Sequence, residues 1–124
     1  MNVVDSSGWL EYFADGPNAG LFAVPLKNAK ELLVPSITIF EVFKVVCRLR
    51  GEDQALQAAA LMQQGKVVDL TAAIALQAAK TSLDLKLPMA DSIILATARL
   101  HNGLLWTQDD DFQGIPGVKY FAKS

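Results

Sequence analysis

Four acidic residues stand where the chain changes from one predicted element to the next. Asp5 directly follows a short apolar run that is typical of a strand, and Asp109 follows another such run after Thr107 and Gln108. Asp91 and Glu41 lie in the first turns of two predicted helices. In parallel α/β sheets ligands bind outside the carboxyl ends of the strands, so side chains at such positions can meet. Carboxylates with no His or Cys among them suit Mg²⁺ or Mn²⁺, and such a site favours chemistry at phosphate esters.

Each acid also has a simpler structural interpretation. The Asp5 carboxylate can accept backbone N–H bonds in the turn that follows it, and Asp91 gains from the positive end of the helix dipole. Glu41, between two apolar neighbours, can form a salt bridge with Lys44 or Arg48 on the same helix. Considered one segment at a time, these interpretations and metal binding both stay open.

Alternating strands and helices must position these acids. The predicted strands cover residues 2–5, 32–34, 67–70, 104–106 and 118–121, and the predicted helices cover residues 8–14, 19–26, 37–50, 52–64, 71–86 and 88–101. This alternation predicts a single domain, residues 1–124, built as a three-layer α/β/α sandwich with a mainly parallel central sheet.

Two of the predicted helices carry more apolar residues than one face needs. The helix at 88–101 begins at Pro88, is closed by Asn102-Gly103 and has almost no polar face, which predicts burial. The lone histidine, His101, falls in its last turn, where an imidazole favours the helix end more than it indicates catalysis. The helix at 37–50 is apolar on more than one side, and we expect its second side to bind another protein chain.

Composition limits the classes of function. Hydrophobic residues make up 52% of the chain and charged residues 19%, which favours an oligomer or a partner that covers apolar surface. The net charge of −2 argues against a broad basic surface, so contact with nucleic acid must be local or bridged by metal. We expect a cytoplasmic protein without a disulfide, because Cys47 is the single cysteine and we recognise neither a signal peptide nor a membrane span.

Four short motifs, in this order and spacing, resemble the PIN domain and, within it, the VapC-like toxins of bacterial and archaeal toxin–antitoxin pairs. They are Val3-Val4-Asp5-Ser6-Ser7, Pro35-Ser36-Ile37 to Glu41-Val42, Ala90-Asp91-Ser92-Ile93-Ile94-Leu95-Ala96-Thr97-Ala98 and Thr107-Gln108-Asp109-Asp110-Asp111-Phe112. The resemblance covers essentially the whole chain. It implies a PIN-like fold, metal-dependent endoribonuclease activity, a homodimer, and inhibition by a small VapB-like antitoxin.

The resemblance also assigns the family's acidic positions. The four main ones match Asp5, Glu41, Asp91 and Asp109, and a further acid of many members matches Asp111. Ser92 stands where many relatives have alanine, which we expect to be harmless. Asp110 adds a third consecutive carboxylate, which leaves open whether Asp109 or Asp111 faces the metal; we expect Asp109 to bind it and Asp111 to support it.

The sequence therefore supports the hypothesis of a Mg²⁺- or Mn²⁺-dependent ribonuclease. The expected metal ligands are Asp5, Asp91 and Asp109. Glu41 is expected to hold metal or orient the attacking water, while Ser6 and Thr107 position ligands or water. The alternative is a non-catalytic PIN-fold module that binds a DNA-binding antitoxin. A phosphatase or receiver-type domain is disfavoured, because no Asp-x-Asp follows the first strand and no lysine is placed to pair with an acyl-phosphate.

Overall fold

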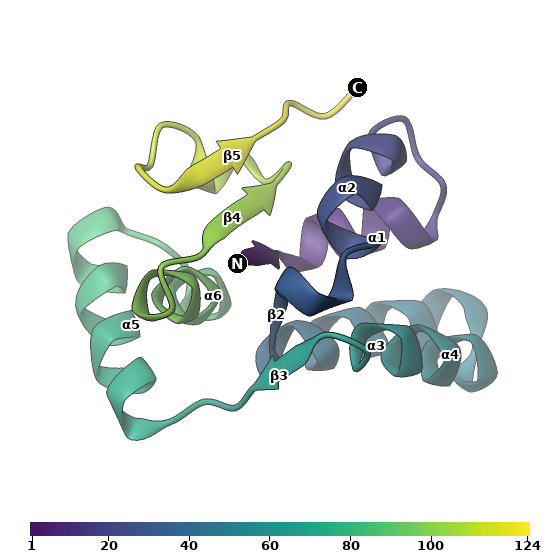
Figure 1. Cartoon of the computed structure of the whole chain (residues 1–124), viewed down its shortest axis with the longest axis horizontal. Helices are drawn as coiled ribbons and strands as arrows, with labels where there is room; N and C mark the ends of the chain where they lie inside the picture. Colours follow the sequence, from purple (N-terminus) through teal and green to yellow (C-terminus); the bar gives the residue numbers. More distant parts are fainter.

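The computed structural model describes residues 1–124 as one five-stranded sheet with helices on both faces (Figure 1). The strands are β1 (Asn2–Val4), β2 (Leu32–Pro35), β3 (Lys66–Val68), β4 (Leu104–Thr107) and β5 (Val118–Tyr120). Their order is β3-β2-β1-β4-β5, and every neighbouring pair is parallel. The prediction of a three-layer α/β/α sandwich with a parallel sheet is therefore confirmed.

The predicted helices are all present, with ends that shift by up to two residues. They are α1 (Ser6–Phe13), α2 (Ala19–Leu26), α3 (Ser36–Arg50), α4 (Glu52–Met62), α5 (Ala72–Leu85) and α6 (Met89–Leu100). Two short 3₁₀ segments, η1 (Ala29–Glu31) and η2 (Asp110–Phe112), were not predicted. The third strand ends at Val68 rather than Leu70. The acidic loop winds into η2 because the Asp109 carboxylate accepts the backbone N–H of Asp111 at its start.

Side chains on the two faces of the sheet build two separate cores. Val4 and Trp106 pack with residues of α1, α2 and α4 on one face, while Val3 and Leu105 pack with α6 on the other. This division follows from the period-two alternation of side chains along a strand. Gly8 brings α1 close to the sheet, since a Cβ at this position would collide with the side chains of Val4 and Phe22.

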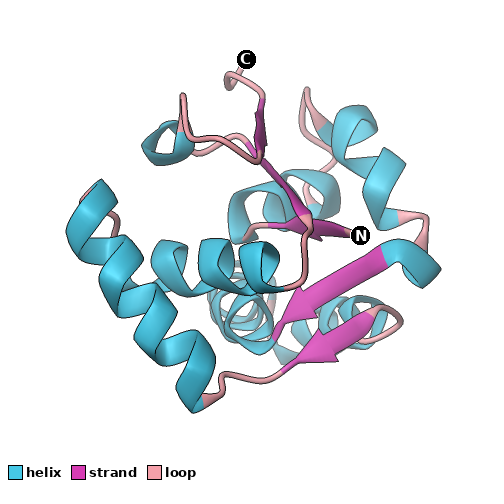
Figure 2. Cartoon of the chain, turned by 60° about the vertical axis from the view of Figure 1, so that its left-hand side comes forward, coloured by secondary structure: helices cyan, strands magenta, loops and turns pink.

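Helix α6 is enclosed on two sides, as its sequence predicted. Ile94 and Leu95 pack toward the sheet, whereas Ile93 and Ala96 pack against α5, which covers the outer side (Figure 2). All residues of Ser92–Ala98 are consequently buried. At the helix end Asn102 takes the left-handed conformation, with φ 52°, and His101 Nδ1 lies 2.9 Å from the carbonyl oxygen of Thr97.

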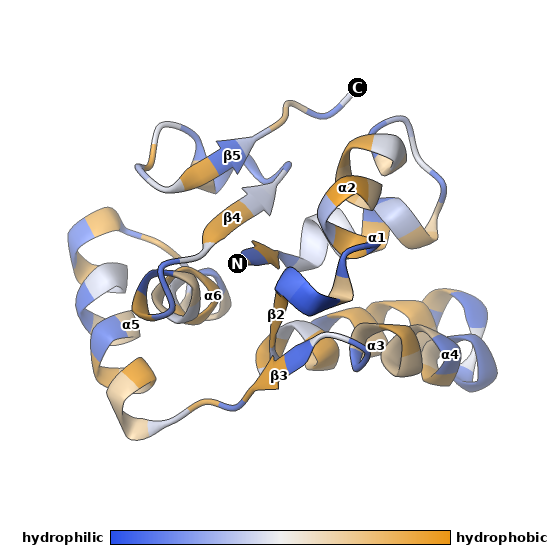
Figure 3. Ribbon diagram, in the orientation of Figure 1, coloured by the Kyte–Doolittle hydropathy of each residue, from blue (hydrophilic) through white to orange (hydrophobic).

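The apolar surface of α3 has a partner inside the chain. Helix α4 packs along α3, and Ala58 and Met62 of α4 share a core with Val42. The second apolar side that we assigned to another protein chain is therefore covered in part by α4. The most exposed large apolar side chains lie instead on α5 and at the start of α6: Leu76, Leu83 and Met89, exposed by 75%, 82% and 72%. Hydrophobic and hydrophilic residues both occur along α5 (Figure 3). None of the helices combines the length and apolar character needed to cross a membrane.

Candidate metal centre

Five carboxylates gather near the carboxyl ends of β1 and β4, which are neighbours in the sheet. We call them the acidic cluster: Asp5, Glu41, Asp91, Asp109 and Asp111. They come from four parts of the chain, since Asp5 follows β1, Glu41 lies in α3, Asp91 lies in the first turn of α6, and the other two flank the start of η2. The other four carboxylates all repel the charge on Asp91, so every acid that the sequence singled out lies within electrostatic range of it.

Three members of the acidic cluster approach one another most closely. Asp91, Asp109 and Asp111 each offer a carboxylate oxygen, and these three oxygens lie within 4.8 Å of one another. An octahedral Mg²⁺ holds its ligands at about 2.0–2.1 Å, so oxygens bound to one ion lie roughly 3–4 Å apart. Small side-chain movements would therefore bring the three oxygens onto one ion. The donor set, oxygen only and negatively charged, fits a hard divalent cation.

Asp5 lies deeper than these three acids and outside their close group. Its side chain is 2% exposed and accepts three hydrogen bonds, from Ser7 Oγ at 2.7 Å, Thr107 Oγ1 at 2.6 Å and the Gly8 backbone N–H at 3.0 Å. Asp5 is therefore the N-cap of α1, as its structural interpretation required. Asp5 therefore joins the start of α1 to the end of β4 through hydrogen bonds. Its role as a metal ligand remains a prediction.

Glu41 is held by a neighbour other than the one expected from helical spacing. The hydroxyl of Ser6 donates a hydrogen bond to Glu41 Oε1 across the boundary between α1 and α3. Neither Lys44 nor Arg48 pairs with Glu41, since the single ion pair in the chain joins the N-terminus and Glu31. The Glu41 carboxylate is thus directed toward α1 rather than along its own helix, and its charge acts on Asp91.

Ser7 is a site residue that sequence reasoning missed. Its hydroxyl donates to Asp5 Oδ1 at 2.7 Å and accepts the backbone N–H of Gln108 at 3.2 Å. Thr107, which was predicted, donates to Asp5 Oδ2 and accepts the Asp109 backbone N–H at 2.9 Å. The two hydroxyls therefore tie the end of β1 to the end of β4. The available signal was the hydroxyl two residues after Asp5, at a position where it can bond to an N-cap carboxylate.

Burial, together with neighbouring negative charges, raises the pKa values of two of these carboxyls. Burial is the main cause for Asp91, whose pKa rises to about 7, and the negative charges of the rest of the acidic cluster add to the rise. Burial also raises the pKa of Asp5 to about 6, against the opposing effect of its three hydrogen bonds. Both carboxylates are therefore costly to ionise without a cation.

The metal-free protein should lose stability as the pH rises. An aspartate in an unfolded chain has a pKa near 3.9, so the folded state binds more protons between about pH 4 and 7. The contribution of Asp5 and Asp91 is fully present below about pH 4 and is lost as the pH passes their folded values of about 6 and 7. We expect the Tm measured in EDTA to fall between pH 5 and 7.5, and to fall less in Asp91→Asn. If the Tm of the wild type and of Asp91→Asn fell equally with pH, ionisation of Asp91 would not be the cause of the loss.

Comparisons with known proteins identify a matching family model and similar folds. The family model described as PIN domain matches residues 3–118. A toxin–antitoxin complex from Klebsiella pneumoniae contains a chain that is 28% identical, with a TM-score of 0.79 over 96% of both chains. VapC20 of Mycobacterium tuberculosis, a sarcin–ricin loop cleaving toxin, is 18% identical, with a TM-score of 0.75 over 94% of this chain and 95% of that one. The DNA-bound VapBC of Salmonella typhimurium is 15% identical, with a TM-score of 0.74 over 98% of both chains. No curated protein sequence matches this chain.

Proposed function

Because the chain belongs to the PIN domain family, we propose that it is a divalent-metal-dependent endoribonuclease and the toxin of a VapBC-type toxin–antitoxin pair. The observation that carries this proposal is the meeting of five carboxylates from four parts of the chain at one edge of a parallel sheet. The toxins named among the structural neighbours support the same assignment. We place the activity in the cytoplasm, where RNA is abundant.

The side chains divide the work at the scissile phosphate. Asp91 and Asp109 would hold the ion, with either Asp111 of the same close group or Asp5 as the further ligand. Bound Mg²⁺ or Mn²⁺ supplies a Lewis acid that polarises the phosphate and acidifies a water molecule. Glu41, oriented by the Ser6 hydroxyl, accepts a proton from the attacking water or helps to hold the cation. Thr107 and Ser7 fix the position of the Asp5 carboxylate by donating hydrogen bonds to it.

An RNA cleavage assay distinguishes this function from its alternative. The purified protein should cut single-stranded RNA with Mn²⁺ or Mg²⁺ and should stop in EDTA. Protein that binds Mn²⁺ and the product of a neighbouring antitoxin gene, yet leaves RNA intact, would instead be the non-catalytic binding module.

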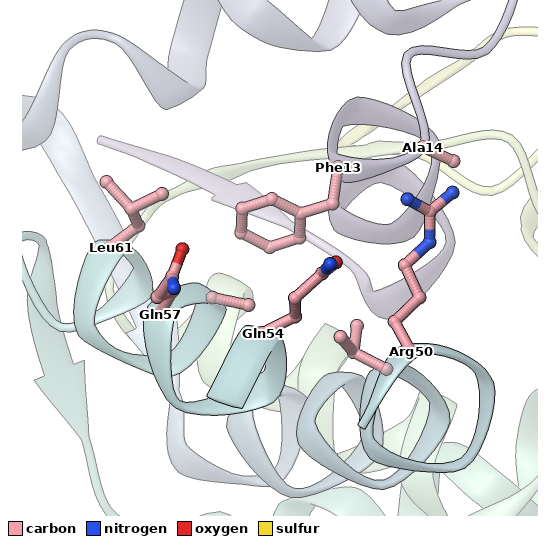
Figure 4. Close-up of a pocket in the computed structure, with 8 residues that line it drawn as sticks. Phe13, Ala14, Arg50, Gln54, Gln57 and Leu61 are labelled. Carbon is pink, nitrogen blue, oxygen red and sulfur yellow. The ribbon is translucent and has the colours of Figure 1, made fainter. Parts of the chain in front are cut away.

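A cleft farther along α3 from the acidic cluster offers a place for an antitoxin segment. A cavity of about 180 Å³ opens between α1, α3 and α4, with Phe13 and Leu61 as apolar walls and Gln54 and Gln57 along one side (Figure 4). Arg50 at this cleft lies about 13 Å beyond Glu41 along the α3 axis. We place the apolar part of a VapB-like antitoxin in this cleft. An arginine of the same segment could then pair with carboxylates of the acidic cluster and compete with the metal.

We also propose that the protein is a homodimer, through α5 and α6 rather than α3. A cavity of about 500 Å³ between these helices has mostly apolar walls, and the exposed Leu83 and Met89 are among its lining residues. A surface that carries both exposed apolar side chains and an apolar cavity suits a twofold interface. In such an interface the side chains of each copy fill the cavity of the other copy.

Leu83→Glu should therefore convert a dimer into a monomer at micromolar concentration, as measured by light scattering. Leu49→Glu is the matched control, because Leu49 is a comparably exposed leucine on α3. Dissociation by the Leu49 variant alone would restore the α3 interface that we expected from the sequence. A wild-type protein that is already monomeric would remove both surfaces from consideration.

A further inference from the structure

Asn18 occupies the N-cap position of α2, but its side chain does not cap that helix. Asparagine is favoured at N-caps because its side-chain oxygen accepts a free N–H group of the first turn. Here the side chain uses its nitrogen instead. Asn18 Nδ2 donates to Gln108 Oε1 and to the carbonyl oxygen of Ala122, each at 3.0 Å, and the residue is 7% exposed. The Asn18 amide group therefore bonds to the residue that follows β4 and to the C-terminal segment.

Gln108 stands between two residues of the metal centre. Thr107 before it donates to Asp5, and Asp109 after it belongs to the closely grouped carboxylates. The Gln108 backbone N–H is bound by Ser7, and its side chain is bound by Asn18. Because side chains alternate along an extended chain, Thr107 points toward the acids while Gln108 points away, toward α2. The segment that carries Asp109 is therefore held from both sides.

Asn18 is itself fixed by α1. Its backbone N–H donates to Glu11 Oε2 at 2.7 Å, and Glu11 lies in the helix that Asp5 caps. The connections form a closed circuit from Asp5 through α1 to Asn18, on to Gln108, and back to Asp5 through Ser7. The backbone that leads into Asp109 is therefore held by bonds within the protein.

We propose that Asn18 is a positioning residue of the metal centre, which aims Asp109 by holding Gln108 and the chain at Ala122. This inference rests on the proposed function for its metal. Groups that orient metal ligands are generally worth about 10- to 100-fold in metal affinity. We expect the loss of the Asn18 amide to weaken Mn²⁺ binding by about tenfold.

Asn18→Ser removes the two side-chain hydrogen bonds without removing a helix cap, because the Asn18 side chain does not cap α2. The serine hydroxyl is too short to reach Gln108. The Mn²⁺ Kd, measured by calorimetry, should rise about tenfold. The metal-free Tm should also fall, because Gln108 Oε1 and the Ala122 carbonyl oxygen lose their donor, so a control of similar stability is needed. Gln108→Ala should raise the Mn²⁺ Kd by a similar factor. The double variant should bind Mn²⁺ no more weakly than the weaker-binding single variant, because both substitutions remove the same contact.

Thr81→Ala is the control for general destabilisation, since Thr81 is buried in α5 on the opposite side of α6 from the sheet. The inference is overturned if Asn18→Ser binds Mn²⁺ as tightly as wild type, or if Thr81→Ala weakens binding equally. An RNA cleavage assay keeps the two proposals apart. Wild-type protein that leaves RNA intact while its Mn²⁺ affinity depends on Asn18 would reject the nuclease and retain the positioning role. If Asn18→Ser keeps both RNA cleavage and wild-type Mn²⁺ affinity, the positioning role is rejected and the nuclease is retained.

Discussion

Asp91→Asn should reduce Mn²⁺-dependent RNA cleavage by at least about 100-fold. Replacing residues that merely orient metal ligands costs roughly 10- to 100-fold, and the loss of a carboxylate that lies within the closest group should cost more. The same substitution should leave the metal-free Tm unchanged or higher, because the pKa of about 7 means that the Asp91 charge is disfavoured in the folded protein. Gel assays of RNA cleavage and thermal melts in EDTA measure the two effects.

Asp84→Asn serves as the control, since Asp84 is an exposed aspartate on α5. It removes the same charge and should cut RNA at the wild-type rate. Activity that disappears from the Asp91 variant, but not from the Asp84 variant purified in the same way, also excludes a contaminating ribonuclease. Near-normal cleavage by Asp91→Asn would remove the metal centre from the proposed mechanism.

Saturating Mn²⁺ should raise the Tm of the wild-type protein by roughly 10 °C. A ligand at 100 times its Kd stabilises the folded state by about 2.7 kcal/mol, and each kcal/mol is worth about 3–5 °C in a chain of this size. Asp111→Asn should lose at least half of this shift, because Asp111 offers one of the three closely grouped oxygens. Asp5→Asn should keep most of the shift while lowering the metal-free Tm, because its new amide group faces hydrogen-bond donors.

This comparison tests the ligand set, for which the sequence favoured Asp5 and the geometry favours Asp111. Asp110→Asn is the matched control, since it removes an equal charge from the same loop at a residue outside the close group. A shift that is lost in Asp5→Asn and kept in Asp111→Asn would establish the ligand set expected from the sequence. Equal losses in the Asp110 and Asp111 variants would indicate general electrostatic attraction instead of coordination.

The architecture could be predicted because local patterns and tertiary packing agree along most of the chain. The apolar face pattern of α6 and its closing Asn102 gave both its limits and its burial. The outer face of α3 was misjudged for a different reason. Its extra apolar residues showed that a partner exists, but periodicity cannot say whether that partner is α4 or a second molecule.

The acidic cluster could be predicted as a set, although its internal geometry could not. Strand ends and helix starts identified which acids meet, whereas hydrogen bonds between distant segments decide how each one points. The link from Ser6 to Glu41 and the link from Asn18 to Gln108 join residues far apart in sequence. Neither leaves a periodic signal, and an asparagine before a helix is most simply explained as a cap. The unusual use of Asn18 is visible only after folding.

The central place of β1 affects when the protein becomes complete during synthesis. The ribosome makes β1 well before β4, the strand with which β1 pairs. Until Thr107 arrives, the Asp5 carboxylate lacks one of its hydrogen-bond donors, and the centre has neither Asp109 nor Asp111. A nascent or prematurely terminated chain therefore carries no assembled centre. Nuclease activity can therefore begin only after the segment that carries Thr107, Asp109 and Asp111 has been made.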